Sequence, residues 1–263
     1  MTLHLARTAI AAALGLCAAV VSTGAAKAAT IRVSQESAAG AGDFDANILG
    51  EIDAYDVVDG ATPLSLAAFY RYGGPTADGY NGAMNGGPDA RSDVTQLFFV
   101  AATDGLHFVT LHDSPDDESG GMAQMTWTLT GGAGGATGFT LFDDVGDAMA
   151  VSDVGADRVF DTTHMWWACC SDGFGIGALP DAFTLLGGFD KSPTGISRLH
   201  AADPAGGVAL VLAAGRRTRF ELAPVSASIP PPVLSTPIPA TLPLAGAALV
   251  ALAALGRRRR ARG

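Results

Sequence analysis

The feature that most constrains the fold of this chain is a set of short stretches in which apolar and polar residues alternate. Residues 122–129 are the clearest case. In an extended strand, one face of this segment would carry Ala123, Met125, Trp127 and Leu129. Side chains of a strand point alternately to opposite faces, so this spacing predicts a strand that is buried on one side only.

The same pattern predicts further strands over residues 64–72, 94–101, 106–112, 139–142, 148–151, 159–162, 182–189, 196–200, 208–213 and 217–222. Glycine- and aspartate-rich turns separate them, and the last two would form a closing hairpin. Only one helix is predicted, over residues 46–55 with Asp45 as its N-cap. The expected fold class is all-β, an antiparallel β-sandwich or jelly roll.

The N-terminus reads as a secretory signal peptide over residues 1–28. Arg7 precedes an apolar run over residues 9–21, and small residues follow. Ala26 and Ala28 stand where a signal peptidase reads small side chains, so cleavage is expected after Ala28. About 205 residues then remain before the tail, which suits one domain over residues 29–222.

The C-terminus has three parts in a row, preceded by a Pro/Ser-rich spacer over residues 223–239. The motif TPIPA covers residues 236–240, and the apolar run 242–255 is barely long enough to span a bilayer as a helix. A basic end would hold this terminus in the cytoplasm and stop transfer. Its arginines are Arg257, Arg258, Arg259, Arg260 and Arg262.

These two ends resemble the PEP-CTERM family of exported bacterial proteins, and most closely its Val-Pro-Leu-Pro-Ala (VPLPA-CTERM) variant. Pro237, Pro239 and Ala240 match that motif, whereas Thr236 and Ile238 depart from it. The resemblance implies export, transient anchoring in the inner membrane by a C-terminal sorting helix over residues 236–263, and cleavage by an exosortase. The product would be released or attached to extracellular polysaccharide at the cell surface.

Two other interpretations of the tail stay open. A plain membrane anchor needs only the apolar run and the arginines. A sortase signal would use LPLAG over residues 242–246, but that segment lies inside the apolar run rather than before it.

The exported domain is strongly acidic. The chain has 26 acidic and 16 basic side chains, and seven of the basic ones belong to the two terminal signals, which leaves 9 against 26, or a formal charge of −17. Such a surface repels nucleic acid and attracts cations. A nucleic-acid partner is therefore excluded.

The least common residues gather in HMWWACCSDGFGIG, residues 164–177. Cys169 and Cys170 can form a vicinal disulfide, stay as free thiols, or bond to another chain. Trp166 and Trp167, with nearby Asp172, form a candidate platform for a sugar ring. The alternative is that one tryptophan faces the core and the other lies on the opposite face of a strand.

Two acidic loops are candidate Ca²⁺ sites, because carboxylates on short loops suit that ion. Their residues are Asp113, Asp116, Asp117, Glu118, Asp143, Asp144 and Asp147. Solvated turn carboxylates are the alternative. A structural Ca²⁺ is the one cofactor that the sequence suggests.

No catalytic motif is present, so no catalytic residue is assigned and the protein is not expected to be an enzyme. The histidines have no spacing that favours zinc. We expect an exported surface or extracellular-matrix protein with a structural or adhesive role. The alternative is a carbohydrate-binding module or carbohydrate-active enzyme that uses Trp166, Trp167 and Asp172.

Overall fold

The structure is a computed structural model that describes residues 30–71, 79–115, 118–144, 147–205 and 209–222, all within one compact unit. The predicted signal peptide, spacer and sorting signal lie outside these residues, as do Asp116 and Asp117. Within the described part of the chain, no helix is both long and apolar enough to cross a membrane.

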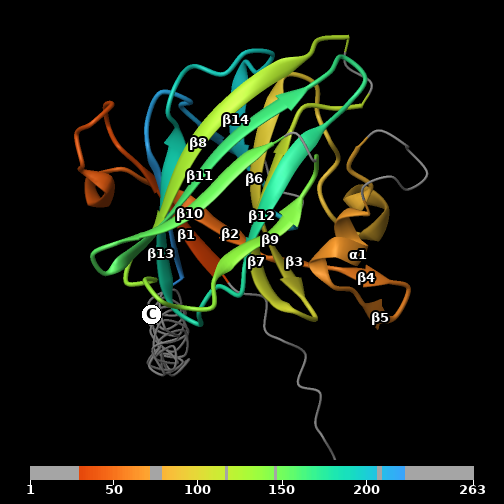
Figure 1. Cartoon of the computed structure of the whole chain (residues 1–263), viewed down its shortest axis with the longest axis horizontal. Coiled ribbons are helices and arrows are strands. Elements are labelled where there is room, and N and C mark those ends of the chain that lie inside the picture. Colours follow the sequence, from red (N-terminus) through yellow and green to blue (C-terminus); the bar gives the residue numbers. More distant parts are fainter. Residues whose placement is uncertain (1–29, 72–78, 116–117, 145–146, 206–208, 223–263) are drawn as a thin grey trace, which may run out of the picture. The chain divides into compact units, whose positions relative to one another are not determined.

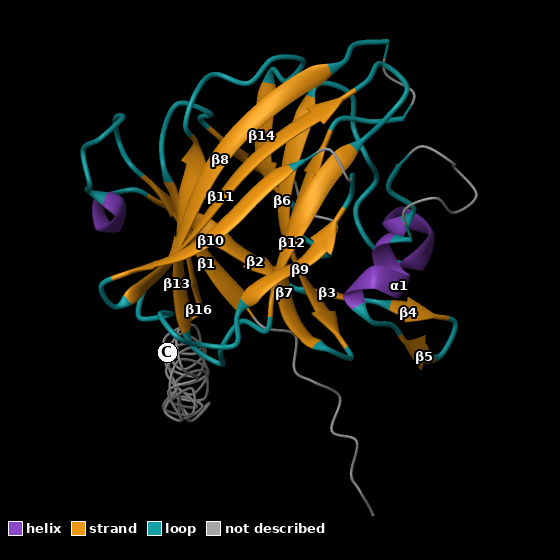
Figure 2. Cartoon of the chain, in the orientation of Figure 1, coloured by secondary structure: helices purple, strands orange, loops and turns teal. Residues whose placement is uncertain are grey.

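The described residues form an all-β body made of two large sheets (Figures 1 and 2). Sheet A has the strand order β10–β11–β8–β13–β16–β1–β2. Its strands are β1 (Thr30–Gln35), β2 (Ile48–Asp53), β8 (Gly121–Leu129), β10 (Ala148–Val154), β11 (Asp157–Trp166), β13 (Phe183–Phe189) and β16 (Thr218–Leu222). All pairings in this sheet are antiparallel.

Sheet B has the order β15–β14–β6–β7–β12–β9, with β3 also paired to β6. Its strands are β3 (Tyr55–Asp56), β6 (Val94–Ala102), β7 (Gly105–His112), β9 (Gly138–Phe142), β12 (Asp172–Gly177), β14 (Arg198–Ala201) and β15 (Leu210–Leu212). β14 and β3 run parallel to β6, so the expectation of purely antiparallel pairing is wrong at these two places. A small hairpin of β4 (Val58–Asp59) and β5 (Thr62–Pro63) completes the strands.

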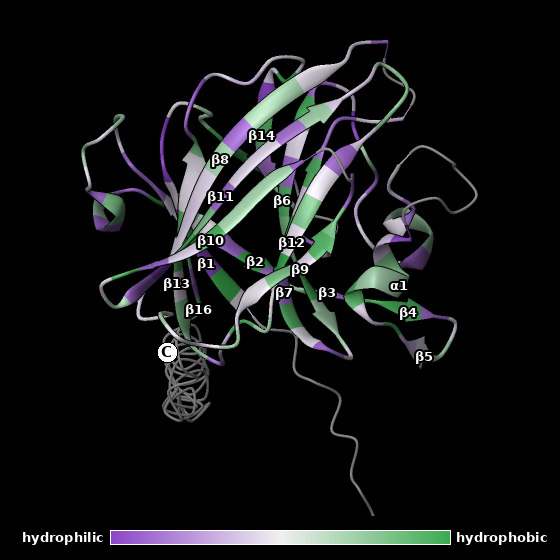
Figure 3. Cartoon of the chain, viewed as in Figure 1, coloured by the Kyte–Doolittle hydropathy of each residue, from purple (hydrophilic) through white to green (hydrophobic). Residues whose placement is uncertain are grey.

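The two sheets face each other across one apolar core, which is a sandwich-like arrangement. Trp127 of sheet A packs on Phe108 of sheet B with ring centroids 4.6 Å apart, and Phe220 lies against both rings. The alternation over residues 122–129 is confirmed, since Ala123, Met125, Trp127 and Leu129 are all buried. Both hydrophobic and hydrophilic segments appear along the strands (Figure 3).

A second apolar cluster covers the outer face of sheet B. The short helix α1 (Leu66–Tyr70) buries Leu66, Phe69 and Tyr70, and these residues pack with apolar side chains of β6 and β7. The sequence predicted a strand here, which is wrong. Ser65 caps the helix by accepting a 3.3 Å hydrogen bond from Ala68 N, and the three buried residues have helical spacing.

The helix can approach sheet B because β12 has glycine at alternate positions. A methyl group at Gly175 would lie 2.6 Å from Leu66, and one at Gly173 would lie 2.9 Å from the Tyr70 hydroxyl. Phe174 and Ile176, between the glycines, are buried in the core that faces sheet A. This strand was not predicted.

Two further expectations are wrong. Residues 46–55 do not form a helix: Asp45 lies within a 3₁₀ turn, η1 (Phe44–Ala46), and β2 follows it, because Ile52 pairs with Ile31 of β1 and is buried in the core. β15 and β16 do not form a hairpin, since they belong to different sheets. Gln35 stabilises the crossover: its side-chain amide donates to Ala213 O at 3.0 Å and accepts from Ala213 N at 2.9 Å.

Candidate functional site

The end of β11 presents alternate side chains to two environments. His164 and Trp166 point inward and are 0% and 4% exposed, whereas Met165 and the following Trp167 are 61% and 81% exposed. The two tryptophans therefore do not form one flat platform. Trp166 belongs to the interior and Trp167 to the surface, which agrees with the alternative that one tryptophan faces the core and the other does not.

A pocket of about 390 Å³ opens beside these tryptophans. Its lining residues are Gly121, Asp144, Asp147, Ala148, Thr163, Met165, Trp166 and Trp167. Indole and thioether groups make one part of its wall, and two carboxylates make another. We refer to it below as the Trp167 pocket.

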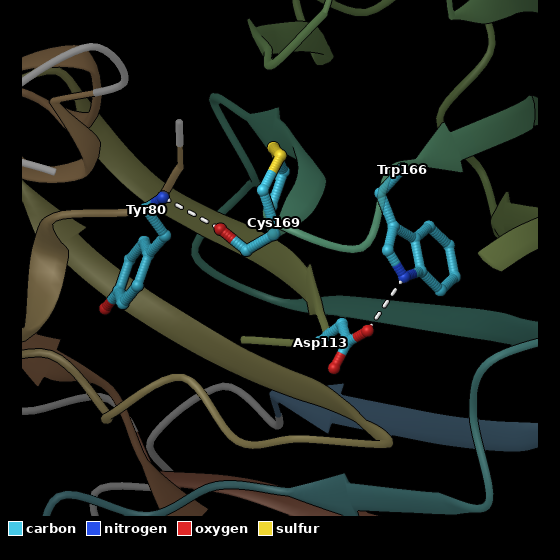
Figure 4. Close-up of a disulfide and its surroundings, with 6 residues drawn as sticks. Tyr80, Asp113, Trp166 and Cys169 are labelled. Atoms are coloured by element: carbon cyan, nitrogen blue, oxygen red, sulfur yellow. Dashed lines mark hydrogen bonds between the residues drawn. A yellow bond between two sulfur atoms is a disulfide. The ribbon is translucent and has the colours of Figure 1, made fainter. Parts of the chain in front are cut away.

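Trp166 is held firmly behind this pocket. Its indole N–H donates a 2.9 Å hydrogen bond to Asp113 Oδ2 (Figure 4), and its ring stacks on the His112 imidazole with centroids 5.2 Å apart and planes 6° from parallel. Gly121, its partner across β8, leaves the space that the ring fills, because a methyl group there would lie 2.2 Å from the indole.

Behind Trp166 lies a group of three side chains that we call the buried acid–histidine cluster: Asp147, His164 and Asp172. Asp147 precedes β10, His164 lies on β11, and Asp172 begins β12. His164 Nδ1 is 3.0 Å from Asp147 Oδ2 and 3.4 Å from Asp172 Oδ1. One ligand atom from each residue lies within 4.8 Å of the others, which is the spacing of a metal-ligand set.

The side chains of the cluster are 4% exposed or less. Burial opposes charging of His164, but the hydrogen bonds to Asp147 and Asp172 outweigh it and raise the pKa of His164 to about 9. Burial also raises the pKa of Asp172, against the lowering effect of His164. Without another cation, the histidine therefore carries a proton between two carboxylates.

A third carboxylate, Asp143, lies close to this cluster. Its Oδ2 accepts a 2.6 Å hydrogen bond from the Tyr70 hydroxyl of α1, and its Oδ1 has no hydrogen-bond partner among the described residues. Burial, together with the negative charges of Asp172 and Asp147, raises the pKa of Asp143 to about 9. Asp143 therefore keeps its proton at neutral pH and adds no charge to the cluster.

His112 completes the buried polar surroundings. Its ring centroid is 5.4 Å from that of His164, and its Nδ1 lies 2.8 Å from Thr95 Oγ1. Burial lowers the pKa of His112 well below its usual value, and the nearby His164 acts in the same direction. His112 is therefore neutral.

Cys169 and Cys170 are joined by a disulfide in the turn between β11 and β12 (Figure 4). Cys170 N donates a 3.0 Å hydrogen bond to Trp167 O, which closes this turn. The next residue, Ser171, accepts a 2.9 Å hydrogen bond from Tyr80 N. Along the chain, the disulfide therefore lies between exposed Trp167 and Asp172 of the buried cluster.

The acidic loops named as Ca²⁺ candidates have different surroundings. Asp113 is fully buried, and besides Trp166 it accepts hydrogen bonds from Asp93 N and Ser114 N, whereas Glu118 is exposed. Of the second loop, Asp143 is buried near the cluster, Asp144 lines the Trp167 pocket, and Asp147 belongs to both pocket and cluster. The structure therefore places a histidine nitrogen among these carboxylates.

Sequence spacing did not indicate His112, His164 or Tyr70 as site residues. They come from separate elements and meet only through the pairing of β12 with β7 and the packing of α1. Asp147 and Asp172 were both noted, but in separate groups. The adjacency of His164 to the tryptophan pair was the only local signal.

Comparisons with known proteins found no matching family model, no matching curated protein and no matching solved structure.

Proposed function

We propose that this protein is an exported cell-surface or extracellular-matrix protein, with a β-sandwich that adheres to carbohydrate through the Trp167 pocket. One observation carries the proposal: Trp167 is 81% exposed at a pocket of about 390 Å³ that also contains Asp144 and Asp147. Exposed Met165 lies in the same pocket wall, and a contiguous exposed apolar patch with polar groups at its rim is typical of an interaction site.

The chemistry of the pocket suits a sugar ring. The C–H face of a sugar packs on an indole ring, as other apolar groups do, while its hydroxyl groups point outward from the ring edge. Carboxylates accept hydrogen bonds from hydroxyls, and bonds to an ionised acceptor are stronger than neutral ones. Trp167 and Met165 supply the first surface, and Asp144 and Asp147 supply the second.

The pocket is also well supported, which favours binding. Trp166 is fixed by Asp113 and His112, and the Cys169–Cys170 disulfide restricts the turn after Trp167. A wall that is rigid before binding loses less side-chain entropy when a ligand arrives. This part of the chain therefore has the properties of a prepared binding surface.

Export is proposed from the two ends of the sequence. The signal peptide with Ala26 and Ala28, and the tail with the TPIPA motif and its arginines, would send the domain across the inner membrane and present it to an exosortase. The disulfide agrees with an oxidising compartment. Extracellular polysaccharide is the expected partner.

The test is binding of the full-length protein to a glycan array and to soluble polysaccharides. We expect Trp167→Ala to weaken binding by about 10- to 100-fold, because it removes the apolar surface that the sugar covers. Met84→Ala is a matched control, since Met84 is 68% exposed and does not line the pocket. Its affinity should equal that of the wild type.

Two results would redirect this proposal. If no glycan binds, or if Trp167→Ala binds as well as the wild type, the domain has a structural role without sugar recognition at this pocket. Hydrolysis of a polysaccharide by the purified protein would make it a carbohydrate-active enzyme, and our assignment as a non-enzyme would be wrong.

A further inference from the structure

The buried acid–histidine cluster has features that sugar binding does not explain. Asp147, His164 and Asp172 come from three separate segments, and their side chains are 4% exposed or less. Asp172 Oδ2 and His164 Nε2 have no hydrogen-bond partner among the described residues. Buried carboxylate oxygens are normally satisfied, so an unpartnered oxygen within a donor cluster indicates a missing ligand.

The distances fit ligands arranged around an ion. Metal–nitrogen and metal–oxygen bonds to Zn²⁺ are about 2.0–2.2 Å, so two ligands at a tetrahedral angle lie roughly 3.3–3.5 Å apart. The 3.4 Å from His164 Nδ1 to Asp172 Oδ1 falls in this range, and the 3.0 Å from His164 Nδ1 to Asp147 Oδ2 is slightly shorter.

Charge leads to the same conclusion. Asp147 and Asp172 bring two carboxylates into the interior, and burying ionised groups is unfavourable unless positive charge compensates them. A divalent ion bound to a neutral imidazole and two carboxylates gives a net charge of zero.

We propose that Asp147, His164 and Asp172 form a binding site for a divalent transition-metal ion, with Zn²⁺ the best fit to three protein ligands. Asp147 also lines the Trp167 pocket, so an ion can enter from solvent there and keep one coordination position open toward the pocket. An imidazole nitrogen suits zinc, cobalt and iron, whereas Ca²⁺ takes oxygen ligands. The site therefore differs in chemistry from the Ca²⁺ sites that the sequence suggested.

The first test uses the full-length protein in detergent after removal of metal with EDTA. Titration with Co²⁺ alone should give visible absorption that saturates at one ion per chain, and Zn²⁺ should abolish it. A hundredfold excess of Ca²⁺ should leave it unchanged. Absence of cobalt absorption together with absence of binding heat for Zn²⁺ would overturn the proposal.

The second test assigns the ligands. Asp147→Asn and His164→Gln should each weaken Co²⁺ binding more than 100-fold, because loss of an outer-shell partner alone typically costs 10- to 100-fold. Asp104→Asn is the matched control: Asp104 also contacts a buried histidine, with Oδ1 3.1 Å from His107 Nε2, but this pair is not part of the three-residue set. It should bind Co²⁺ as the wild type does.

Circular dichroism of each variant checks that it folds. If a variant does not fold, X-ray absorption of the zinc-loaded wild type decides: one imidazole with oxygen ligands supports the site, and any other ligand set overturns it. Wild-type affinity in a folded Asp147→Asn variant also overturns it. None of these measurements uses a glycan, so the carbohydrate proposal can fail without affecting this one.

Discussion

The carboxylate of Glu36 accepts hydrogen bonds from both the backbone N–H and the guanidinium of Arg217, 181 positions further along the chain. Its oxygens also accept from Gly40 N and Gly42 N, each at 3.1 Å. The hydrogen bonds to Arg217 outweigh burial and lower the pKa of Glu36 to about 2. Glu36, which follows β1, is thereby fixed to Arg217, which precedes β16.

We expect Glu36→Gln to lower the free energy of unfolding by about 2 kcal/mol at pH 7, because a charge-assisted network is lost. Since the folded pKa lies below the unfolded value, the contribution of Glu36 is complete above about pH 4.5 and is lost as the pH falls toward 2. Urea denaturation across this range checks it. The difference in unfolding free energy between Glu36→Gln and the wild type should shrink in acid. The exposed control Glu51→Gln should have nearly the same unfolding free energy as the wild type. A difference for Glu36→Gln that stays constant with pH would contradict the assignment.

We expect Asp113 to contribute to the stability of the fold rather than to Ca²⁺ binding. Asp113→Ala removes the acceptor of the Trp166 indole and of two backbone N–H groups, and it places alanine at a φ of 62°. We expect a loss of about 3 kcal/mol, against about 1 kcal/mol for Asp113→Asn, which tolerates that backbone conformation. Urea denaturation measures both. Equal stability of Asp113→Ala and the wild type would show that the indole contact contributes nothing.

Removing the disulfide should affect binding more than stability. The Cys169–Cys170 disulfide closes a loop of only two residues, so the stabilisation that comes from restricting the unfolded chain is about 1 kcal/mol. For a Cys169→Ser, Cys170→Ser double variant we expect a fall in melting temperature of about 2–4 °C. Glycan affinity should fall further, because the turn that carries Trp167 loses its restraint. Loss of folding in the double variant would contradict this.

Processing of the two ends can be read from the mass of the mature protein. In a producing cell that has an exosortase, we expect an N-terminus at residue 29 and loss of the C-terminal arginines. Replacing Pro237 and Pro239 by alanine should leave the precursor in the inner membrane. If the variant is cleaved as the wild type is, the motif is not the recognition element, and an uncleaved wild-type tail would make it a plain anchor.

Local alternation was sufficient to find most of the strands. Trp127 and its neighbours on β8 follow the period of two, because one face of that strand meets the core. β12 escaped detection because its glycines are set by the approach of α1, which is a tertiary requirement. The pairing of β2 with β1 likewise overrode a helical pattern that was visible locally.

The candidate site was only half visible in the sequence, for a related reason. Asp147, Asp172 and the tryptophans stood out by composition, but His164 joins them only when β10, β11 and β12 are in place. Histidine spacing along the chain carries no information about a cluster assembled from three elements. The cluster exists only when these strands pair in register.

That register has a consequence for how this region can change. β11 pairs with β8 without a bulge from Arg158↔Leu129 to Trp166↔Gly121, and its parity alone sends His164 inward and Met165 outward. A shift of one residue would exchange the two sets, placing Met165 among the carboxylates and His164 in the open. Insertion or deletion of a single residue within β11 would thus disrupt both the proposed sugar-binding surface and the proposed ion ligand His164, so the two can be lost in one event although they can be mutated separately.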